Sequence, residues 1–108
     1  HNNTLLGKFQ RDKLIIFMLD NPDPNKQIGG LGDRIGGLLT AFIFALRNIP
    51  NRKFIIMCDD EGLKKAFQPY KNAIPIVSHN VSITDLYDTK DILDLSYCIN
   101  PDDHYKQQ

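Results

Sequence analysis

Two short apolar runs enclose an amphipathic segment, and this order constrains the fold more than any other feature of the sequence. Residues 13–19 and 53–58 each begin with lysine and continue as apolar runs, which is typical of strands buried on both faces. Between them, apolar residues recur at the spacing of one helix face: Ile35, Leu38, Leu39, Phe42, Ile43 and Leu46. This order predicts two parallel strands joined by a helical crossover.

The rest of the chain extends the pattern. Acidic residues 59–61 open a second helix that we expect to reach about Tyr70. Residues 73–77 form a weaker strand, which Pro75 confines to a sheet edge or a strand start. Residues 91–95 fit helix and strand equally well. The predicted fold class is therefore α/β, a Rossmann-like parallel sheet with flanking helices in one domain over residues 1–108.

The first predicted helix, from Ile35 to about Arg47, is apolar over nearly its whole surface. Apolar residues at positions 41, 44 and 45 widen its face and leave Thr40 as almost the only polar side chain. A helix of this kind is normally covered on two sides. We therefore expect something other than its own sheet to pack against it.

Charge and cysteine content exclude several classes of partner. Thirteen basic residues balance thirteen acidic ones, so no global field draws the chain to nucleic acid, and no stretch is long enough to cross a membrane. Cys58 and Cys98 are too few for a zinc site, and we expect buried free thiols and no metal. Because the chain begins at His1, we expect any targeting segment to lie outside it, which leaves the compartment open.

Residues 29–37 contain five glycines around the pair Asp33 and Arg34. Glycine is costly in regular structure, so we interpret this stretch as a loop that turns sharply before the helix and lets an anion approach free N–H groups. A phosphate-bearing ligand is the first hypothesis, with these glycines as its contacts: Gly29, Gly30, Gly32 and Gly36. Ligands of parallel sheets bind beyond the carboxyl ends of the strands, where residues 59–61 share the same edge.

Two familiar phosphate loops do not fit this stretch. Counted from Gly30, the third glycine of a dinucleotide fingerprint falls at position 35, which is Ile35, and about ten residues separate Leu19 from Gly30. A P-loop requires Gly-Lys followed by Ser or Thr, and lysine is absent here. We therefore expect neither a nicotinamide or flavin enzyme nor a nucleotide triphosphatase.

Four motifs occur in order: Gly29-Gly30-Leu31-Gly32-Asp33-Arg34, a helix with Phe42 and Ala45-Leu46, Arg52-Lys53-Phe54-Ile55-Ile56, and Phe67-Gln68-Pro69. Together they resemble the N-terminal half of fucosyltransferase-like glycosyltransferases, the superfamily of core α-1,6- and protein O-fucosyltransferases. The resemblance covers about Leu14 to Tyr70. It implies a GT-B arrangement, in which two Rossmann-like domains face each other across a cleft and the second domain holds most of the donor, GDP-fucose, without a metal or other cofactor.

By this resemblance the chain is the acceptor-side domain of an enzyme that transfers fucose to a hydroxyl of a glycan or protein acceptor. Asp33, which matches an Asn of protein O-fucosyltransferases, and Arg34 are then the catalytic candidates, close to the sugar diphosphate. From the residues alone, Asp33 is also a candidate N-cap of the helix, and Arg34 a candidate for a surface ion pair.

The donor-binding His-x-Arg motif of the family is absent, because His79 is followed by Asn80-Val81 and His104 by Tyr105-Lys106. We therefore expect this chain to be inactive without a C-terminal donor-binding domain. His79 itself is expected to be a solvated loop residue. The alternative function is a non-catalytic Rossmann-like module that binds a nucleotide or phosphosugar.

Overall fold

A computed structural model of the chain describes residues 13–23, 25–26, 30–68, 74–97 and 101. Four strands form one parallel sheet: β1 (Leu14–Met18), β2 (Lys53–Met57), β3 (Ile76–Val77) and β4 (Ile92–Asp94). Two α-helices accompany them in this part of the chain, α2 (Leu31–Asn48) and α3 (Glu61–Phe67). The α/β Rossmann-like fold class predicted from the sequence is confirmed.

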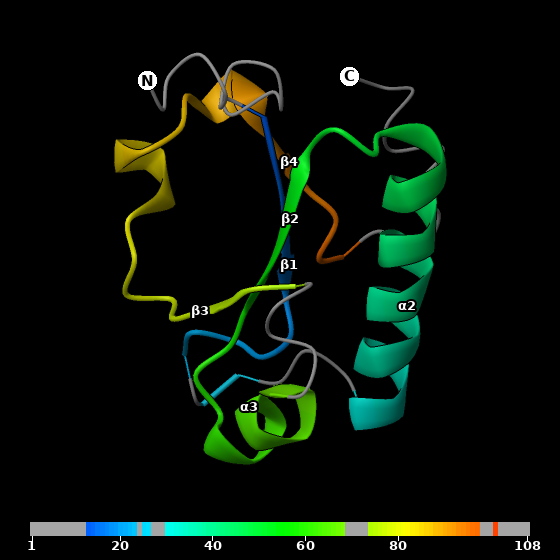
Figure 1. Cartoon of the computed structure of the whole chain (residues 1–108). Coiled ribbons are helices and arrows are strands. Elements are labelled where there is room, and N and C mark those ends of the chain that lie inside the picture. The colour runs from blue at the N-terminus through cyan, green and yellow to red at the C-terminus, as the bar shows by residue number, and fades with distance from the viewer. Residues whose placement is uncertain (1–12, 24, 27–29, 69–73, 98–100, 102–108) are drawn as a thin grey trace.

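The strand order in the sheet is β3-β2-β1-β4. The chain moves from β1 through α2 to β2 and through α3 to β3, and then returns across the sheet to place β4 on the other side of β1. All four strands are parallel, but the order in which successive strands are added to the sheet changes direction between β1 and β4. Both β1 and β2 end at the lower edge in Figure 1, where α2 begins and α3 lies. In open parallel sheets, ligands bind at such an edge beside the reversal.

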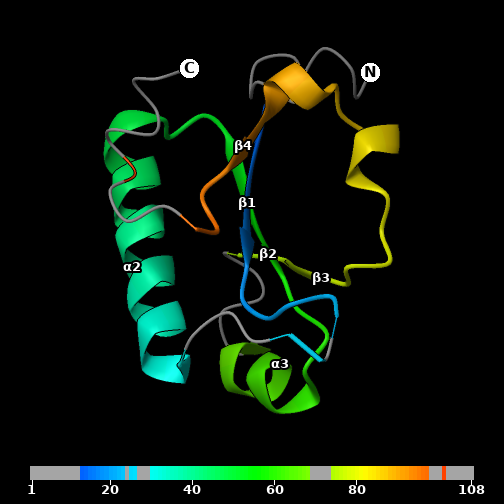
Figure 2. The same cartoon turned by 180° about the vertical axis from the view of Figure 1, so that it is seen from behind.

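Helix α2 covers one face of the sheet, and both views of the molecule show it running alongside β1 and β2 in the opposite direction (Figures 1 and 2). Its buried residues, Leu38, Ala41, Phe44 and Ala45, belong to the main hydrophobic core, which also contains Ile15, Phe17, Phe54, Ile56 and Leu93. The half-buried Phe42 ring packs edge-on against Phe54 with the ring centres 5.3 Å apart. These rings therefore serve the core, as their places in the apolar pattern predict.

The opposite face of the sheet has no covering α-helix among the described residues. A smaller cluster around Leu14, Ile55 and Met57 lies on this side. The segment that crosses here contains only two short 3-10 turns, η2 (Ile83–Asp85) and η3 (Thr89–Asp91). Ile83 packs against the cluster, but the cover is thinner than that given by α2.

Residues 91–95, left open between helix and strand, supply β4, which pairs with β1 from Leu14 opposite Ile92 to Ile16 opposite Asp94. Pro75 stands just before the edge strand β3, where its carbonyl accepts a hydrogen bond of 3.0 Å from the Ile56 amide. The expected position of this proline at a strand start is confirmed.

The prediction of a glycine-rich loop before the helix is wrong for the residues after Gly30. Helix α2 begins at Leu31 rather than Ile35, so Gly32, Gly36 and Gly37 are helical. None of the described glycines has the positive φ that would require the residue. At Gly37 an added Cβ would already be in van der Waals contact with the Phe17 ring, at 3.4 Å, so there is room for little more than a methyl group. The helix therefore continues across the glycines and presses against β1.

We predict opposite effects for leucine at two adjacent glycines. Gly37→Leu should lower the free energy of unfolding by about 2 kcal/mol, because the side chain meets Phe17. Gly36→Leu is the matched control and should raise that free energy by up to about 1 kcal/mol, since nothing lies within 4 Å of its Cβ and leucine favours helix. Urea unfolding in dilute solution measures both; equal losses would contradict the packing assigned to Gly37.

Candidate functional site

Arg34 joins the carboxyl ends of β1 and β4, the two strands between which the sheet reverses. From the first turn of α2, its guanidinium donates one hydrogen bond to the Met18 carbonyl and another, of 2.8 Å, to the Ser96 carbonyl. The Ser96 hydroxyl in turn accepts a hydrogen bond of 2.8 Å from the Met18 amide. These contacts fix the start of α2 at the reversal point.

Two aromatic rings flank the Arg34 guanidinium, Phe17 at 4.8 Å and Tyr97 at 5.5 Å from its carbon to the ring centre. Its Nε atom is buried without a hydrogen-bond partner among the described residues. Burial lowers the pKa of Arg34 below its usual value, while the nearby Tyr97 and Asp94 act in the opposite direction. The side chain still carries its charge at neutral pH.

The two roles weighed from the sequence for Arg34, a surface ion pair and a phosphate contact, stay predictions, and the structure adds a third role, hydrogen bonding to backbone carbonyls. Its charge lies at the expected edge, but its two terminal nitrogens serve backbone carbonyls. Each of these nitrogens carries a second N–H, so the two hydrogen bonds use two of the five guanidinium donors. The geometry makes Arg34 a residue that positions the start of α2.

The start of α2 is open. Gly30 is the N-cap in extended backbone, with φ −71° and ψ 157°, and no side chain caps the helix, so the predicted N-cap role of Asp33 is wrong. The first intrahelical bond runs from the Arg34 amide to the Gly30 carbonyl, at 3.1 Å. The amides of Leu31, Gly32 and Asp33 precede that bond and have no partner within the helix.

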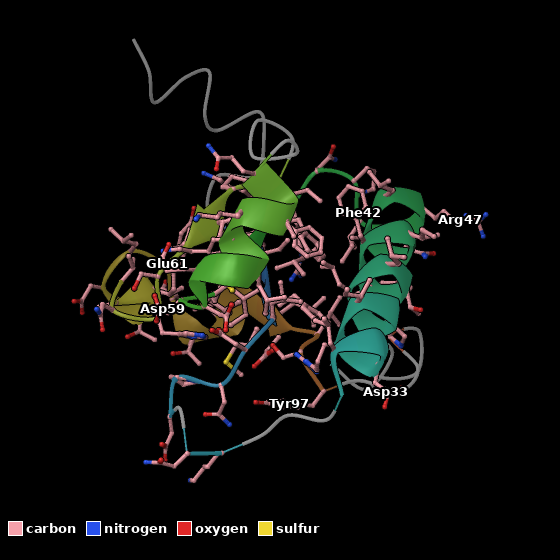
Figure 3. All side chains as sticks on the ribbon, turned by 90° about the horizontal axis from the view of Figure 1, so that it is seen from below. Asp33, Phe42, Arg47, Asp59, Glu61 and Tyr97 are labelled. Carbon is pink, nitrogen blue, oxygen red and sulfur yellow. The ribbon has the colours of Figure 1, made fainter. Side chains whose placement is uncertain are left out.

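The surroundings of this turn are also open, because a Cβ built on Gly30, Gly32 or Gly36 meets no atom within 4 Å. Asp33 is exposed at the end of α2, as Figure 3 shows. Gly36 lies one turn further along the helix, on its side rather than at its end. Gly29 lies outside the described residues. Of the expected contacts, Gly30, Gly32, Asp33 and Arg34 are thus together at the sheet edge.

A second network at the same edge was missed in the sequence. The carboxylate of Asp20, just after β1, accepts hydrogen bonds from the amides of Asp59 at 3.0 Å and Asp60 at 2.8 Å, and from His79 Nε2 at 2.7 Å. Burial by itself raises the pKa of Asp20, but these hydrogen bonds outweigh it and the net pKa is lowered. Asp20 therefore ties together the segments that follow three strands.

The side chain of His79 is only 7% exposed, so the expectation of a solvated loop residue is wrong. Its ring is held by Asp20, and its backbone amide donates to Asp59 at 3.3 Å. Asp60 is the N-cap of α3 and accepts from the Leu63 amide at 2.9 Å. The acidic run 59–61 thus acts first as a helix start, as predicted. The sequence feature that could have indicated the Asp20 network is the position of this carboxylate directly after a predicted strand.

Cys58 lies next to this network, and its thiol is expected to be unreactive. Its free thiol is buried, and burial together with the nearby Asp20 carboxylate raises its pKa to about 11. The thiol is therefore almost fully protonated at neutral pH and is a poor nucleophile. Cys98 lies outside the described residues. Within the described part of the chain, no group of three His, Cys, Asp or Glu residues is arranged to hold a metal ion.

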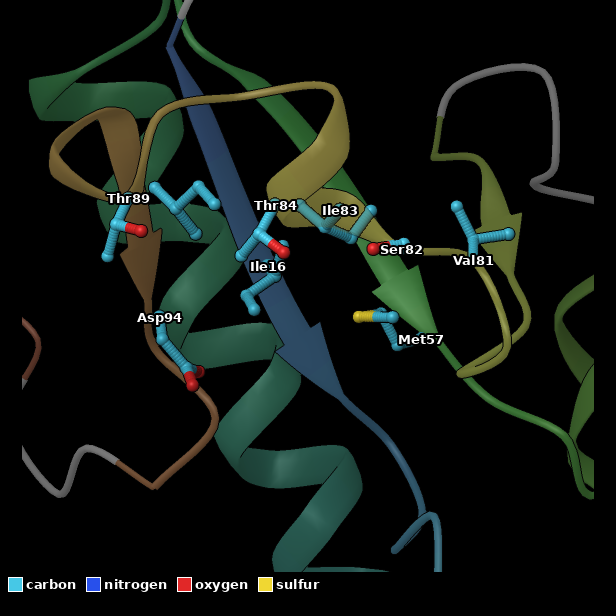
Figure 4. A pocket seen from close by; sticks show the side chains of 9 residues that line it. Ile16, Met57, Val81, Ser82, Ile83, Thr84, Thr89 and Asp94 are labelled. Atoms are coloured by element: carbon cyan, nitrogen blue, oxygen red, sulfur yellow. The ribbon is translucent and has the colours of Figure 1, made fainter.

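A hollow of about 460 Å³ lies on the sheet face away from α2, between the strands and the 3-10 segment (Figure 4). Its lining is mainly apolar and consists of Ile16, Met57, Val81, Ser82, Ile83, Thr84, Thr89, Ile92 and Asp94. No sequence motif marks it, because its walls come from four separate segments. It is distinct from the open end of α2.

Comparison of the chain with protein-family models, with curated proteins and with solved structures found no match. Among the described residues, no helix is long and apolar enough to span a membrane. The function proposed below therefore depends on the motifs of the sequence and on the geometry of the sheet edge.

We predict that Arg34→Ala destabilises the fold by about 2 kcal/mol, because it removes two charge-assisted hydrogen bonds from the β1 and β4 carbonyls. Arg47→Ala is the control: this arginine is exposed in the last turn of α2, and its loss should change stability by less than about 0.5 kcal/mol. Chemical denaturation compares the two. Equal midpoints would show that Arg34 does not hold the strand ends together.

We predict that Asp20→Asn lowers the free energy of unfolding by about 2 kcal/mol at neutral pH, because the amide cannot accept all of the hydrogen bonds now made by the carboxylate. The folded-state pKa of Asp20 is depressed, so its contribution is complete above the ordinary value of 3.8 and is lost as the pH falls through the folded value.

Urea titrations should therefore give free energies of unfolding for wild type and Asp20→Asn that differ by a constant amount near neutral pH and converge in acid. Asp85→Asn, a change at an exposed aspartate of the 3-10 segment, is the control and should leave the free energy of unfolding unchanged at every pH. A difference between wild type and Asp20→Asn that persists unchanged into strong acid would contradict the role of the Asp20 charge.

Proposed function

We propose that this chain is the acceptor-side domain of a fucosyltransferase-like glycosyltransferase, with the start of α2 facing the cleft to a donor-binding domain. One observation carries the proposal: the open first turn of α2, with Asp33 exposed, lies at the carboxyl edge where strand order reverses between β1 and β4. The same turn contains the Gly-x-Gly-Asp-Arg core of the resemblance to that superfamily.

The chemistry of this edge suits a sugar diphosphate. The amides of residues 31–33, which have no partner within the helix, and the positive end of the helix dipole favour an anion. Arg34 adds a fixed positive charge just behind the turn. Tyr97, which is 57% exposed beside Arg34, offers an aromatic face on which a sugar or base can pack.

In this proposal Asp33 serves the acceptor rather than the donor. A carboxylate next to a diphosphate is repelled by it, whereas a carboxylate can accept the proton of an attacking acceptor hydroxyl. The hydroxyl oxygen then forms a bond to the anomeric carbon of fucose, the bond from that carbon to GDP breaks, and GDP leaves. The second domain supplies the donor site and the charge that stabilises departing GDP.

One observation favours a second candidate, a non-catalytic module that binds a nucleotide or phosphosugar. The two terminal nitrogens of Arg34 each donate a hydrogen bond to a backbone carbonyl, and among the described residues no hydrogen bond to the Asp33 side chain is found. The edge therefore offers a surface that can bind an anion, but Asp33 and Arg34 are not arranged as a pair of catalytic groups. This candidate uses the same amides and differs only in the absence of transfer.

We predict that the full-length gene product releases GDP from GDP-fucose in the presence of mixed glycan and protein acceptors, and that Asp33→Ala slows this release by about 100-fold. The melting temperature should not change, because Asp33 is exposed and does not cap α2. Asp85→Ala is the control at an equally exposed aspartate.

The outcomes separate the two candidates. Full release by Asp33→Ala would remove Asp33 from the mechanism. If the wild-type protein releases no GDP but its amides of residues 31–33 shift in NMR spectra when GDP-fucose is added, the binding module is correct. Absence of both release and shifts would overturn the proposal as a whole.

A further inference from the structure

The side of α2 that faces away from the sheet carries a stripe with regular spacing. Its residues alternate at steps of four and three, and they are Gly32, Gly36, Leu39, Ile43 and Leu46. Leu39 is 55%, Ile43 48% and Leu46 57% exposed. Alternating steps of four and three place residues along the seam where one helix packs against another. The expectation that something beyond the sheet covers this helix thus has a defined surface.

The two glycines of the stripe have no explanation within the described chain. A Cβ at Gly32 or Gly36 would meet nothing within 4 Å, and neither residue has a positive φ. Glycine inside a helix is less favourable than alanine, so its use there indicates a requirement from outside. A partner that approaches the helix backbone closely supplies such a requirement.

We propose that this stripe is the interface of a homodimer, in which the α2 helices of two copies pack antiparallel about a twofold axis at Leu39. This arrangement matches large residues to small ones. Leu46 lies seven positions after Leu39 and Gly32 seven before it, so Leu46 of one copy fits over Gly32 of the other. Ile43 and Gly36, four after and three before, form the next such pair.

A parallel pair would lack this match. It would set glycine against glycine at one end and leucine against leucine at the other, so that no single distance between the helices packs both halves. The antiparallel stripe is instead complementary to itself, because each half of it fits the other half. Self-complementarity is the condition for a symmetric dimer and is the reason for choosing a second copy over a different protein.

Charge supports the same orientation. Asp33 stands at the start of α2 and Arg47 at its end, both exposed, and Figure 3 shows Arg47 extending away from the sheet. Antiparallel packing brings each of these residues near the opposite charge on the other copy, and it also opposes the two helix dipoles. The formal net charge of the chain is zero, so two copies do not repel each other at long range.

The dimer is tested separately from the proposed glycosyl transfer, although Gly32 and Asp33 belong to both surfaces. The free amides point along the axis from the end of α2, whereas the stripe runs along the side of the helix. One helix face is a small interface compared with the roughly 800 Å² per partner of stable complexes. We therefore expect weak association, with a dissociation constant on the order of 100 µM.

Sedimentation equilibrium of the 108-residue chain, without any nucleotide sugar, tests the interface. The apparent mass should rise from 12.3 kDa in dilute solution toward twice that value as the concentration approaches about 1 mM. Leu39→Glu places two like charges at the twofold axis and should weaken association at least about tenfold. Leu86→Glu makes the same change at a leucine that is 70% exposed outside α2, and should not weaken it.

Gly36→Leu separates the interface from folding. Its side chain has free space in the single chain, so circular dichroism should show an intact fold while association is lost. A chain that remains monomeric up to about 1 mM overturns the proposal. So does a dimer that both Leu39→Glu and Gly36→Leu leave intact, because its interface must then lie elsewhere.

Disulfide cross-linking tests the orientation, with Cys98 replaced by serine and Cys58 protected by its burial. Leu39→Cys should form a disulfide-linked dimer, because both copies meet at the axis. Gly32→Cys should not, since its two copies lie 14 positions out of register, about 21 Å along the helix, which a disulfide cannot bridge. Cross-linking of Gly32→Cys as readily as Leu39→Cys would overturn the antiparallel arrangement.

Discussion

The carboxyl edge of the sheet depends on the contact of Arg34 with the ends of β1 and β4. The pairing of β1 with β4 ends at Ile16 and Asp94, so the carbonyl groups of Met18 and Ser96 lie beyond the last paired residues. The guanidinium donates to both of these carbonyls. Because the same residue belongs to the first turn of α2, satisfying these carbonyls also sets where the helix starts. The place of the open helix end therefore follows from the hydrogen-bond needs of the sheet.

On the other side of β1, Asp20 accepts hydrogen bonds from backbone amides in the same way as Arg34 donates them to carbonyls. There, backbone amides of the segment after β2 require an acceptor, and the carboxylate provides it while also holding the His79 ring. A cation thus serves carbonyls on one side of β1, and an anion serves amides on the other. The amides of residues 31–33 at the start of α2 belong to neither set and have no partner within the helix.

The sequence predicted the elements whose formation depends on local burial. The apolar runs gave β1 and β2, and the helical spacing gave α2, since burial of each stripe requires that structure. The start of α2 was misplaced because the local cost of glycine was given more weight than the packing of Gly37 on Phe17. Asp20 and His79 are 59 positions apart, and the three residues of β4 form a strand only beside β1. Such contacts have no local pattern from which to predict them.

The glycine-rich stretch is best understood as several separate requirements that meet in one helix. Gly30 leaves the helix start uncapped, Gly37 fits the inner face to Phe17, and Gly32 and Gly36 lie bare on the outer face. A phosphate site needs only the first of these, because free amides occur at any uncapped helix end. Of the remaining glycines, Gly37 contacts Phe17 within the chain, and in the proposed dimer Gly32 and Gly36 receive side chains of the second copy. A motif that resembles a ligand loop can therefore also encode the surfaces by which a helix is packed.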